Sequence, residues 1–159
     1  MTKEEKPEEH DAWTRRLAAS ANNRAWTLSE QAARTPAEDQ EMLHAAHAAA
    51  HLWQAVGTEH HCALAQLLLA QVHALLGHPS LAEQYANEAH QYFLGRKSEP
   101  WELALSHVVM ANAANCAGKA AAHLQHYQTG VEMIDALADP EEKDILLASL
   151  RVVPRPAGG

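Results

Sequence analysis

The amino-acid sequence predicts an all-α protein in which three antiparallel helical hairpins stack and a last helix closes the stack. Apolar residues make up 47% of the 159-residue chain, aromatic residues only 5%, and alanine is the commonest residue. Alanine is the best helix former, and its small side chain lets neighbouring helices approach closely. The segments 69–82 and 110–123 share one layout, a helix of small residues, a Gly turn and a second helix. Their turn glycines, Gly77 and Gly118, stand 41 positions apart, a period typical of helical arrays.

The two ends of the chain differ in composition from its middle. Residues 1–10 are mostly charged and contain Pro7, and residues 151–159 contain two prolines and two glycines. We therefore expect a disordered N-terminal segment at 1–10, a single helical domain at 11–150 and a flexible tail at 151–159.

The first helix is expected over residues 11–34, and the second ends at residue 56, before Gly57. Thr35, Pro36 and Glu38 mark the boundary between them. Thr35 suits the N-cap and Pro36 the first turn, and Glu38, three residues after the cap, completes a capping box.

The third and fourth helices are expected over residues 59–76 and 79–94. Gly77 suits the left-handed position after a helix, and Pro79 suits the first turn of the next one. Leucine and valine lie nearly all round the third helix, which indicates that other helices cover it on several sides.

The fifth helix is expected from about residue 98 to 117 and is apolar in the same way, so the third and fifth helices form the middle of the stack. The sixth extends from Gly118 to about residue 137. Asp139, Pro140 and Glu142 predict a second capping box, which opens a last helix ending near residue 150.

The charge of the chain argues against a nucleic-acid partner. Twenty Asp and Glu residues against 12 Lys and Arg give a formal charge of −8, and no basic cluster is present to neutralise a phosphate backbone. Residues 1–10 have no apolar core, so we expect no export leader, and no segment has the roughly 18 apolar residues of a membrane span. We therefore expect a cytoplasmic protein without a membrane partner. Cys62 and Cys116 form no CxxC pair, which argues against a disulfide framework or a thiolate zinc site.

The second and third hairpins resemble the tetratricopeptide repeat. That family has a Leu-Gly pair, a turn Gly and two small packing residues. At these positions the second hairpin has Leu69, Ala70, Gly77, Ala82 and Ala89, and the third has Met110, Ala111, Gly118, His123 and Gly130. The chain is also similar, over residues 38–49, to small bacterial tetratricopeptide-like proteins to which no activity is assigned. The resemblance implies a right-handed superhelix, with helices longer than those of the usual repeat of about 34 residues.

The resemblance further implies a concave groove along the first helix of each hairpin. The residues directed into it are Asn23, Trp26, Glu30, Leu67, Gln71, Val108, Asn112 and Asn115. Such a groove suits an extended peptide or a partner helix. Asn112 matches a position that holds a peptide carboxylate in chaperone-binding relatives, but Leu67, Gln71 and Val108 replace the basic residues of that clamp. In the alternative interpretation, Asn112 and Asn115 bond each other or nearby carbonyls inside an apolar helix, because an unpartnered buried amide costs about 1–3 kcal/mol.

His44, His47 and His51 form a stripe on the second helix, within about 60° of one another and opposite its apolar face. His47 and His51 are four residues apart, a spacing that can place two imidazoles on one metal ion, and Glu41 precedes His44 in a Glu-x-x-His arrangement. Helical di-iron sites need two such arrangements, so a dinuclear site is not expected. Further ligands for a single zinc or nickel ion would have to come from His60, His61 or His107. We expect solvated or interhelical histidines, with metal binding, adventitious or functional, as the alternative.

These observations together favour a binding module without catalytic activity or cofactor. No Gly-rich phosphate loop and no nucleophile signature is present. Trp13, Trp26, Trp53 and Trp101 are expected to be packing anchors of a small-residue core. The expected partner is a protein or peptide, and a homodimer is expected because the end faces of short stacks often pair. The alternative function is binding of a small molecule or a metal by the histidine stripe.

Overall fold

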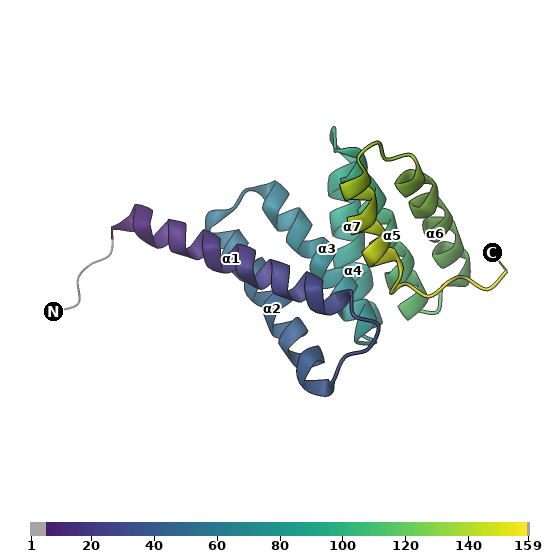
Figure 1. Ribbon diagram of the computed structural model, residues 1–159, viewed down its shortest axis with the longest axis horizontal. Coiled ribbons are helices and arrows are strands. Elements are labelled where there is room, and N and C mark those ends of the chain that lie inside the picture. The colour runs from purple at the N-terminus through teal and green to yellow at the C-terminus, as the bar shows by residue number, and fades with distance from the viewer. Residues whose placement is uncertain (1–5, 159) are drawn as a thin grey trace.

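The structure is a computed structural model and describes residues 6–158, which form seven α-helices and no strand. The helices are α1 (Pro7–Ser29), α2 (Pro36–Val56), α3 (Glu59–Leu75), α4 (Pro79–Leu94), α5 (Pro100–Cys116), α6 (Ala120–Asp135) and α7 (Pro140–Leu150). Consecutive helices pack against each other, as Figure 1 shows, and this confirms the predicted all-α fold of helical hairpins. The prediction of disorder at residues 1–5 lies outside the described part of the chain.

Three hairpins, α1–α2, α3–α4 and α5–α6, are stacked side by side, and α7 packs against α5 and α6 (Figure 1). The first helices of the hairpins are also in contact, α1 with α3 and α3 with α5. None of the helices within residues 6–158 is long and apolar enough to cross a lipid bilayer.

The turns of the second and third hairpins have the same backbone geometry. Gly77 and Gly118 have φ values of +76° and +72°, in the left-handed region that favours glycine. The amide of the residue after each glycine donates to the carbonyl oxygen four positions before that glycine, at 2.9 Å in both turns. This is the Schellman arrangement that ends a helix. The two hairpins therefore repeat with the register that the 41-residue spacing predicts.

The hydrophobic core runs along α3 and α5, in each of which ten residues are buried. Ala70 and Ala111, at equivalent positions of the two helices, are completely buried. Alanine at these positions lets α3 and α5 lie close to their neighbours. The prediction that these two helices form the middle of the stack is confirmed.

Both ends of α1 differ from the prediction. The helix begins at Pro7, four residues early, because proline suits its first turn. It ends at Ser29 rather than at residue 34, because the Arg34 guanidinium folds back and donates to the carbonyl oxygens of Leu28 (3.4 Å) and Gln31 (3.3 Å). These bonds satisfy carbonyl groups that the end of the helix leaves without an intrahelical donor.

One of the two predicted capping boxes is complete. The Thr35 hydroxyl accepts from the Glu38 amide at 3.2 Å, and the Glu38 carboxylate accepts from the Thr35 amide at 3.3 Å. The Asp139 carboxylate caps α7 through the amide of Glu141 at 2.9 Å, but the reciprocal bond expected of Glu142 is absent from the described residues.

The chain beyond α7 packs against the helices for several residues. Val153 is 3% exposed and belongs to the main core cluster. His123 Nε2, on α6, donates to the carbonyl oxygen of Pro154 at 2.7 Å. The packed part of the chain thus extends past the limit expected at residue 150.

Candidate functional site

Half of the residues expected to line a concave groove are buried between helices. Leu67 and Gln71 of α3 and Val108 of α5 are completely buried, and Asn112 of α5 is 2% exposed. These side chains lie in the interior of the stack and form no open surface. The contact between α3 and α5 places these four side chains inside the stack.

Asn112 and Gln71 bond to each other across two hairpins. Asn112 Nδ2 donates to Gln71 Oε1 at 3.0 Å, and Gln71 Nε2 is the one buried side-chain nitrogen or oxygen without a partner among the described residues. The two residues are 41 positions apart, so equivalent positions of successive hairpins meet. Asn112 is thus satisfied inside the stack, and its partner is Gln71 rather than the Asn115 expected from the sequence.

The other expected groove residues remain accessible. Asn23 and Glu30 are exposed, and Trp26 and Asn115 are partly exposed. Partial burial raises the pKa of the Glu30 carboxyl, and the nearby positive charge of Arg151 acts against this rise. The end of α1 therefore lies near the end of α7.

A pocket of about 210 Å³ opens where α1, α2, α3 and α5 meet. We call it the tryptophan pocket; its lining residues are Asn22, Trp26, Trp53, His61, Leu64, Trp101 and Leu105. The rings of Trp53 and His61 are stacked, with centroids 4.3 Å apart and an interplanar angle of 6°. Of these residues, sequence analysis assigned only Trp26 to a binding surface. Trp13 is not a packing anchor as predicted, because 53% of it is exposed near the start of α1.

A larger hollow of about 610 Å³ lies beside α6 and includes Tyr127, Leu150 and Arg155. This hollow is more open to solvent than the tryptophan pocket, and the chain beyond α7 forms part of its wall. It contains none of the residues that sequence analysis assigned to a binding surface.

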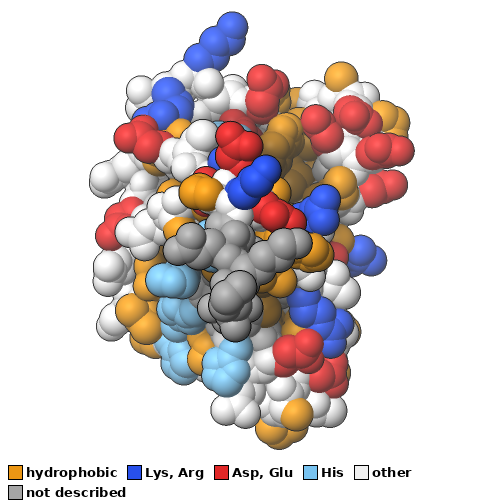
Figure 2. All heavy atoms as spheres, turned by 90° about the vertical axis from the view of Figure 1, so that its left-hand side faces the viewer, with side chains coloured by type: hydrophobic (Ala, Val, Ile, Leu, Met, Phe, Trp, Pro, Cys, Tyr) orange, Lys and Arg blue, Asp and Glu red, His pale blue; other side chains and the backbone are white. Residues whose placement is uncertain are grey.

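The histidine stripe of α2 is exposed, as its pattern predicts, at all three of its members, His44, His47 and His51. Figure 2 shows a group of histidine side chains side by side on one surface of the protein. His47 Nε2 lies 3.0 Å from Nε2 of the buried His73, and His73 Nδ1 lies 3.0 Å from Nδ1 of His78. Burial lowers the pKa of His73 to about 4, with repulsion from the two neighbouring imidazoles adding to the effect.

These contacts form a hydrogen-bonded chain of imidazoles rather than a set of convergent ligands. Both nitrogens of His73 are engaged, and a neutral imidazole donates through one nitrogen and accepts through the other. The three members of the stripe do not converge on a common point with any other His, Cys, Asp or Glu of residues 6–158.

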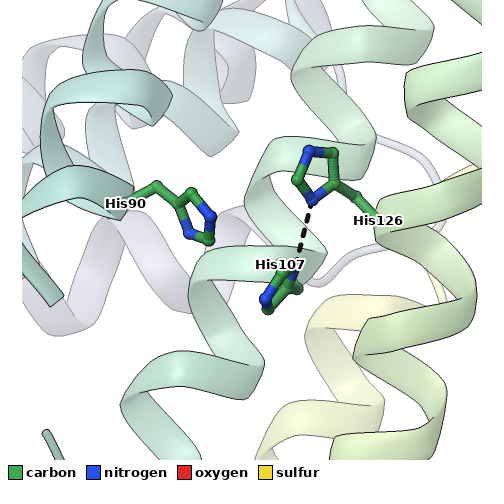
Figure 3. A group of neighbouring side chains, drawn as sticks. All are labelled: His90, His107 and His126. Atoms are coloured by element: carbon green, nitrogen blue, oxygen red, sulfur yellow. Dashed lines mark hydrogen bonds between the residues drawn. The ribbon is translucent and has the colours of Figure 1, made fainter. Parts of the chain in front are cut away.

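One convergent group of potential metal ligands does occur in the described chain, and it lies elsewhere. His90 of α4, His107 of α5 and His126 of α6 each offer a nitrogen within 4.8 Å of the other two (Figure 3). Burial lowers the pKa of all three imidazoles, and neighbouring rings lower it further for His90 and for His107, whose pKa falls to about 4. The sequence pattern indicated His107 only as an additional ligand for the stripe, and it gave no signal for His90 or His126.

Two features of the structure are consistent with a helical repeat. The equivalent turns at Gly77 and Gly118 and the buried alanines of α3 and α5 are features of a helical repeat. No family model, no curated protein and no solved structure matches this chain.

Proposed function

We propose that this protein is a non-catalytic, tetratricopeptide-like binding module that holds one apolar side chain of a peptide or partner helix in the tryptophan pocket. The observation that carries the proposal is the convergence of Trp26, Trp53 and Trp101, from α1, α2 and α5, on one pocket. Tryptophan is enriched among the residues that contribute most to binding energy at protein interfaces.

The size of the pocket favours a side chain over a small molecule. Pockets for drug-sized ligands have volumes of roughly 300–1,000 Å³, whereas this one has about 210 Å³. Leu64 and Leu105 add apolar surface to its wall. Burial of a Leu or Phe side chain of a partner would contribute about 1.5–3 kcal/mol.

Polar groups at the pocket suit the backbone of a bound peptide. The indole N–H groups of Trp26, Trp53 and Trp101 have no hydrogen-bond acceptor among the described residues, so carbonyl oxygens of a ligand can accept from them. His61 is engaged already, because its Nδ1 accepts from the Thr58 amide at 3.1 Å and its ring lies on Trp53. Indole donors of residues that line an apolar pocket, without a partner among the described residues, suit the recognition of a peptide.

The test is selection of peptides from a random display library on the purified protein, followed by affinity measurements with the selected peptides. We expect peptides with a bulky apolar anchor, whose affinity falls about 30-fold for Trp101→Ala, as is typical of a hot-spot residue. Trp13→Ala is the matched control, because Trp13 is a tryptophan outside the pocket, and it should leave the affinity unchanged. Variants are compared only where circular dichroism shows the same helix content and a cooperative melt.

Two results would count against the proposal. One is a selection that enriches no peptide. The other is a set of peptides that bind folded Trp101→Ala as tightly as they bind the unmodified protein.

A further inference from the structure

We infer that His90, His107 and His126 bind one zinc ion through three imidazole nitrogens and leave its fourth coordination position open to a neighbouring cavity. The three rings come from three consecutive helices and converge in the space between them (Figure 3). This site is separate from the tryptophan pocket, with which it shares no residue.

The distances between the rings suit a tetrahedral ion. Four-coordinate zinc holds imidazole nitrogens at about 2.0–2.1 Å, which places two ligand nitrogens roughly 3.3 Å apart. His107 Nδ1 and His126 Nδ1 are 3.0 Å apart, and the ligand atoms of all three residues lie within 4.8 Å of one another. Two nitrogens are therefore nearly in place, and the third has about 1.5 Å to move at most, a distance within reach of a side-chain rotation.

The neighbours of His90 orient its imidazole for metal binding. The Ser106 hydroxyl donates its single hydrogen to the Leu103 carbonyl oxygen at 2.8 Å. The contact of 2.9 Å between Ser106 Oγ and His90 Nδ1 must therefore be a bond that His90 donates. This bond leaves His90 Nε2 unprotonated, with a lone pair for the ion. A second partner that fixes the tautomer in this way is typical of metal-binding histidines.

The hydrogen bonds of the cluster leave some of its ring nitrogens without a partner. Nε2 of His90, His107 and His126 has no partner among the described residues, and none of these atoms is sealed from solvent. Water can reach the cluster, and so can an ion. An ion bound to His107 Nδ1 and His126 Nδ1 would replace the proton that these two atoms share, and the Nε2 atoms of both rings would then carry the ring protons.

The surroundings leave one coordination position open. A cavity of about 180 Å³ borders His126 and is also lined by Glu83, Asn87 and Lys119. The Glu83 carboxylate is held by Lys119 Nζ at 2.5 Å and is thus engaged in an ion pair. Three protein ligands with water in the fourth position form the open type of zinc site.

The donor set decides which ion is expected. Three neutral nitrogen ligands exclude magnesium and calcium, which take oxygen ligands. Three imidazoles with water in the fourth position are a known ligand set of zinc, whereas copper(II) favours tetragonal geometry. The formal charge of −8 also favours the approach of a cation.

The experiment uses full-length, untagged protein that has been stripped with a chelator and is then titrated with zinc chloride by calorimetry. We expect one zinc ion per chain, a melting temperature that rises with zinc concentration, and, with cobalt(II) as a probe, the visible absorption of a tetrahedral complex. Because the titration contains no peptide, its failure would leave the tryptophan pocket untouched, and failure of the peptide selection would leave this site untouched.

Substitutions then locate the ion. His107→Asn and His126→Gln, on different helices, should each weaken zinc binding at least 100-fold, and Ser106→Ala should weaken it about 10-fold through the loss of the bond that orients His90. The matched control is the double variant His44→Ala and His51→Ala, which removes two exposed histidines of α2 and should leave zinc binding unchanged. Either ligand variant that folds suffices for the comparison.

The proposal is overturned by the absence of stoichiometric zinc binding, by an octahedral cobalt spectrum, or by zinc binding that is unchanged in a folded ligand variant. It is also overturned by binding that is lost in the control variant. That last result would assign the ion to the α2 surface.

Discussion

The buried amide pair between α3 and α5 can be tested with a double-mutant cycle. Gln71 is completely buried, Asn112 is 2% exposed, and their single hydrogen bond of 3.0 Å leaves Gln71 Nε2 without a partner in the described chain. Asn112→Leu removes the only donor to Gln71 and leaves a whole amide unsatisfied, which should lower the free energy of unfolding by about 1–3 kcal/mol. Gln71→Met, of similar shape, leaves the Asn112 amide without its acceptor and should cost a similar amount.

The double variant should be at least as stable as either single variant, because it removes both amides and fills their space with apolar atoms. The coupling free energy of the pair is thus expected to be about 1–3 kcal/mol. Urea unfolding measures it, provided that the slopes of the four transitions agree. Single effects that add to within about 0.5 kcal/mol would refute the reasoning, because they would mean that water satisfies the amides.

Three further predictions follow from other parts of the fold. The pKa of His73 is about 4 in the folded state against its ordinary value of 6.5, so the unfolded state binds more protons as the pH falls below 6.5. The free energy of unfolding should therefore be highest above pH 6.5 and about 2 kcal/mol lower at pH 5. Urea unfolding should show a weaker pH dependence for His73→Leu, and an unchanged pH dependence would contradict the assignment. Gly118→Ala should cost about 1–2 kcal/mol and Gly118→Asn less, because φ is +72° and no atom lies within 4 Å of an added Cβ; equal thermal midpoints for both variants would show that φ is not the cause. If the expected homodimer forms through the exposed Trp13 and Leu17 of α1, the double substitution Trp13→Glu and Leu17→Glu should yield monomers in sedimentation, and a protein that sediments as a monomer without the substitution contradicts this interface.

The fold could be predicted because its determinants are local and repeat. Gly77 and Gly118 each end a helix through a left-handed residue, and the alanine-rich segments before them have high helix propensity. The end of α1 could not be predicted in the same way. It depends on the Arg34 side chain, which folds back onto the carbonyl oxygens of Leu28 and Gln31, and this contact has no signal in helix propensity.

The exposure of the expected groove residues could be predicted only in part. Repeat register identifies which helices face one side of the stack, and Trp26 lines a pocket. The register does not give the distance between neighbouring helices. Because Ala70 and Ala111 allow neighbouring helices to pack closely, Leu67 and Gln71 lie in the interior of the stack. Trp53 and Trp101 reach the pocket from α2 and α5, which depends on the rotation of each helix about its axis.

The histidines show most clearly what local spacing does not reveal. A search for ligands four residues apart identifies the stripe of α2, yet residues on one helix face solvent together unless another helix covers them. His90, His107 and His126 are instead separated by 17 and 19 positions, close to the length of one helix and its turn. In a pair of antiparallel helices, two residues lie at the same level when they are about equally far from the turn. His107 is 11 positions before Gly118 and His126 is 8 positions after it, so the two side chains meet across the turn between α5 and α6. The sequence gives the distance of each histidine from its turn, but it does not give the rotation of each helix that brings the rings together.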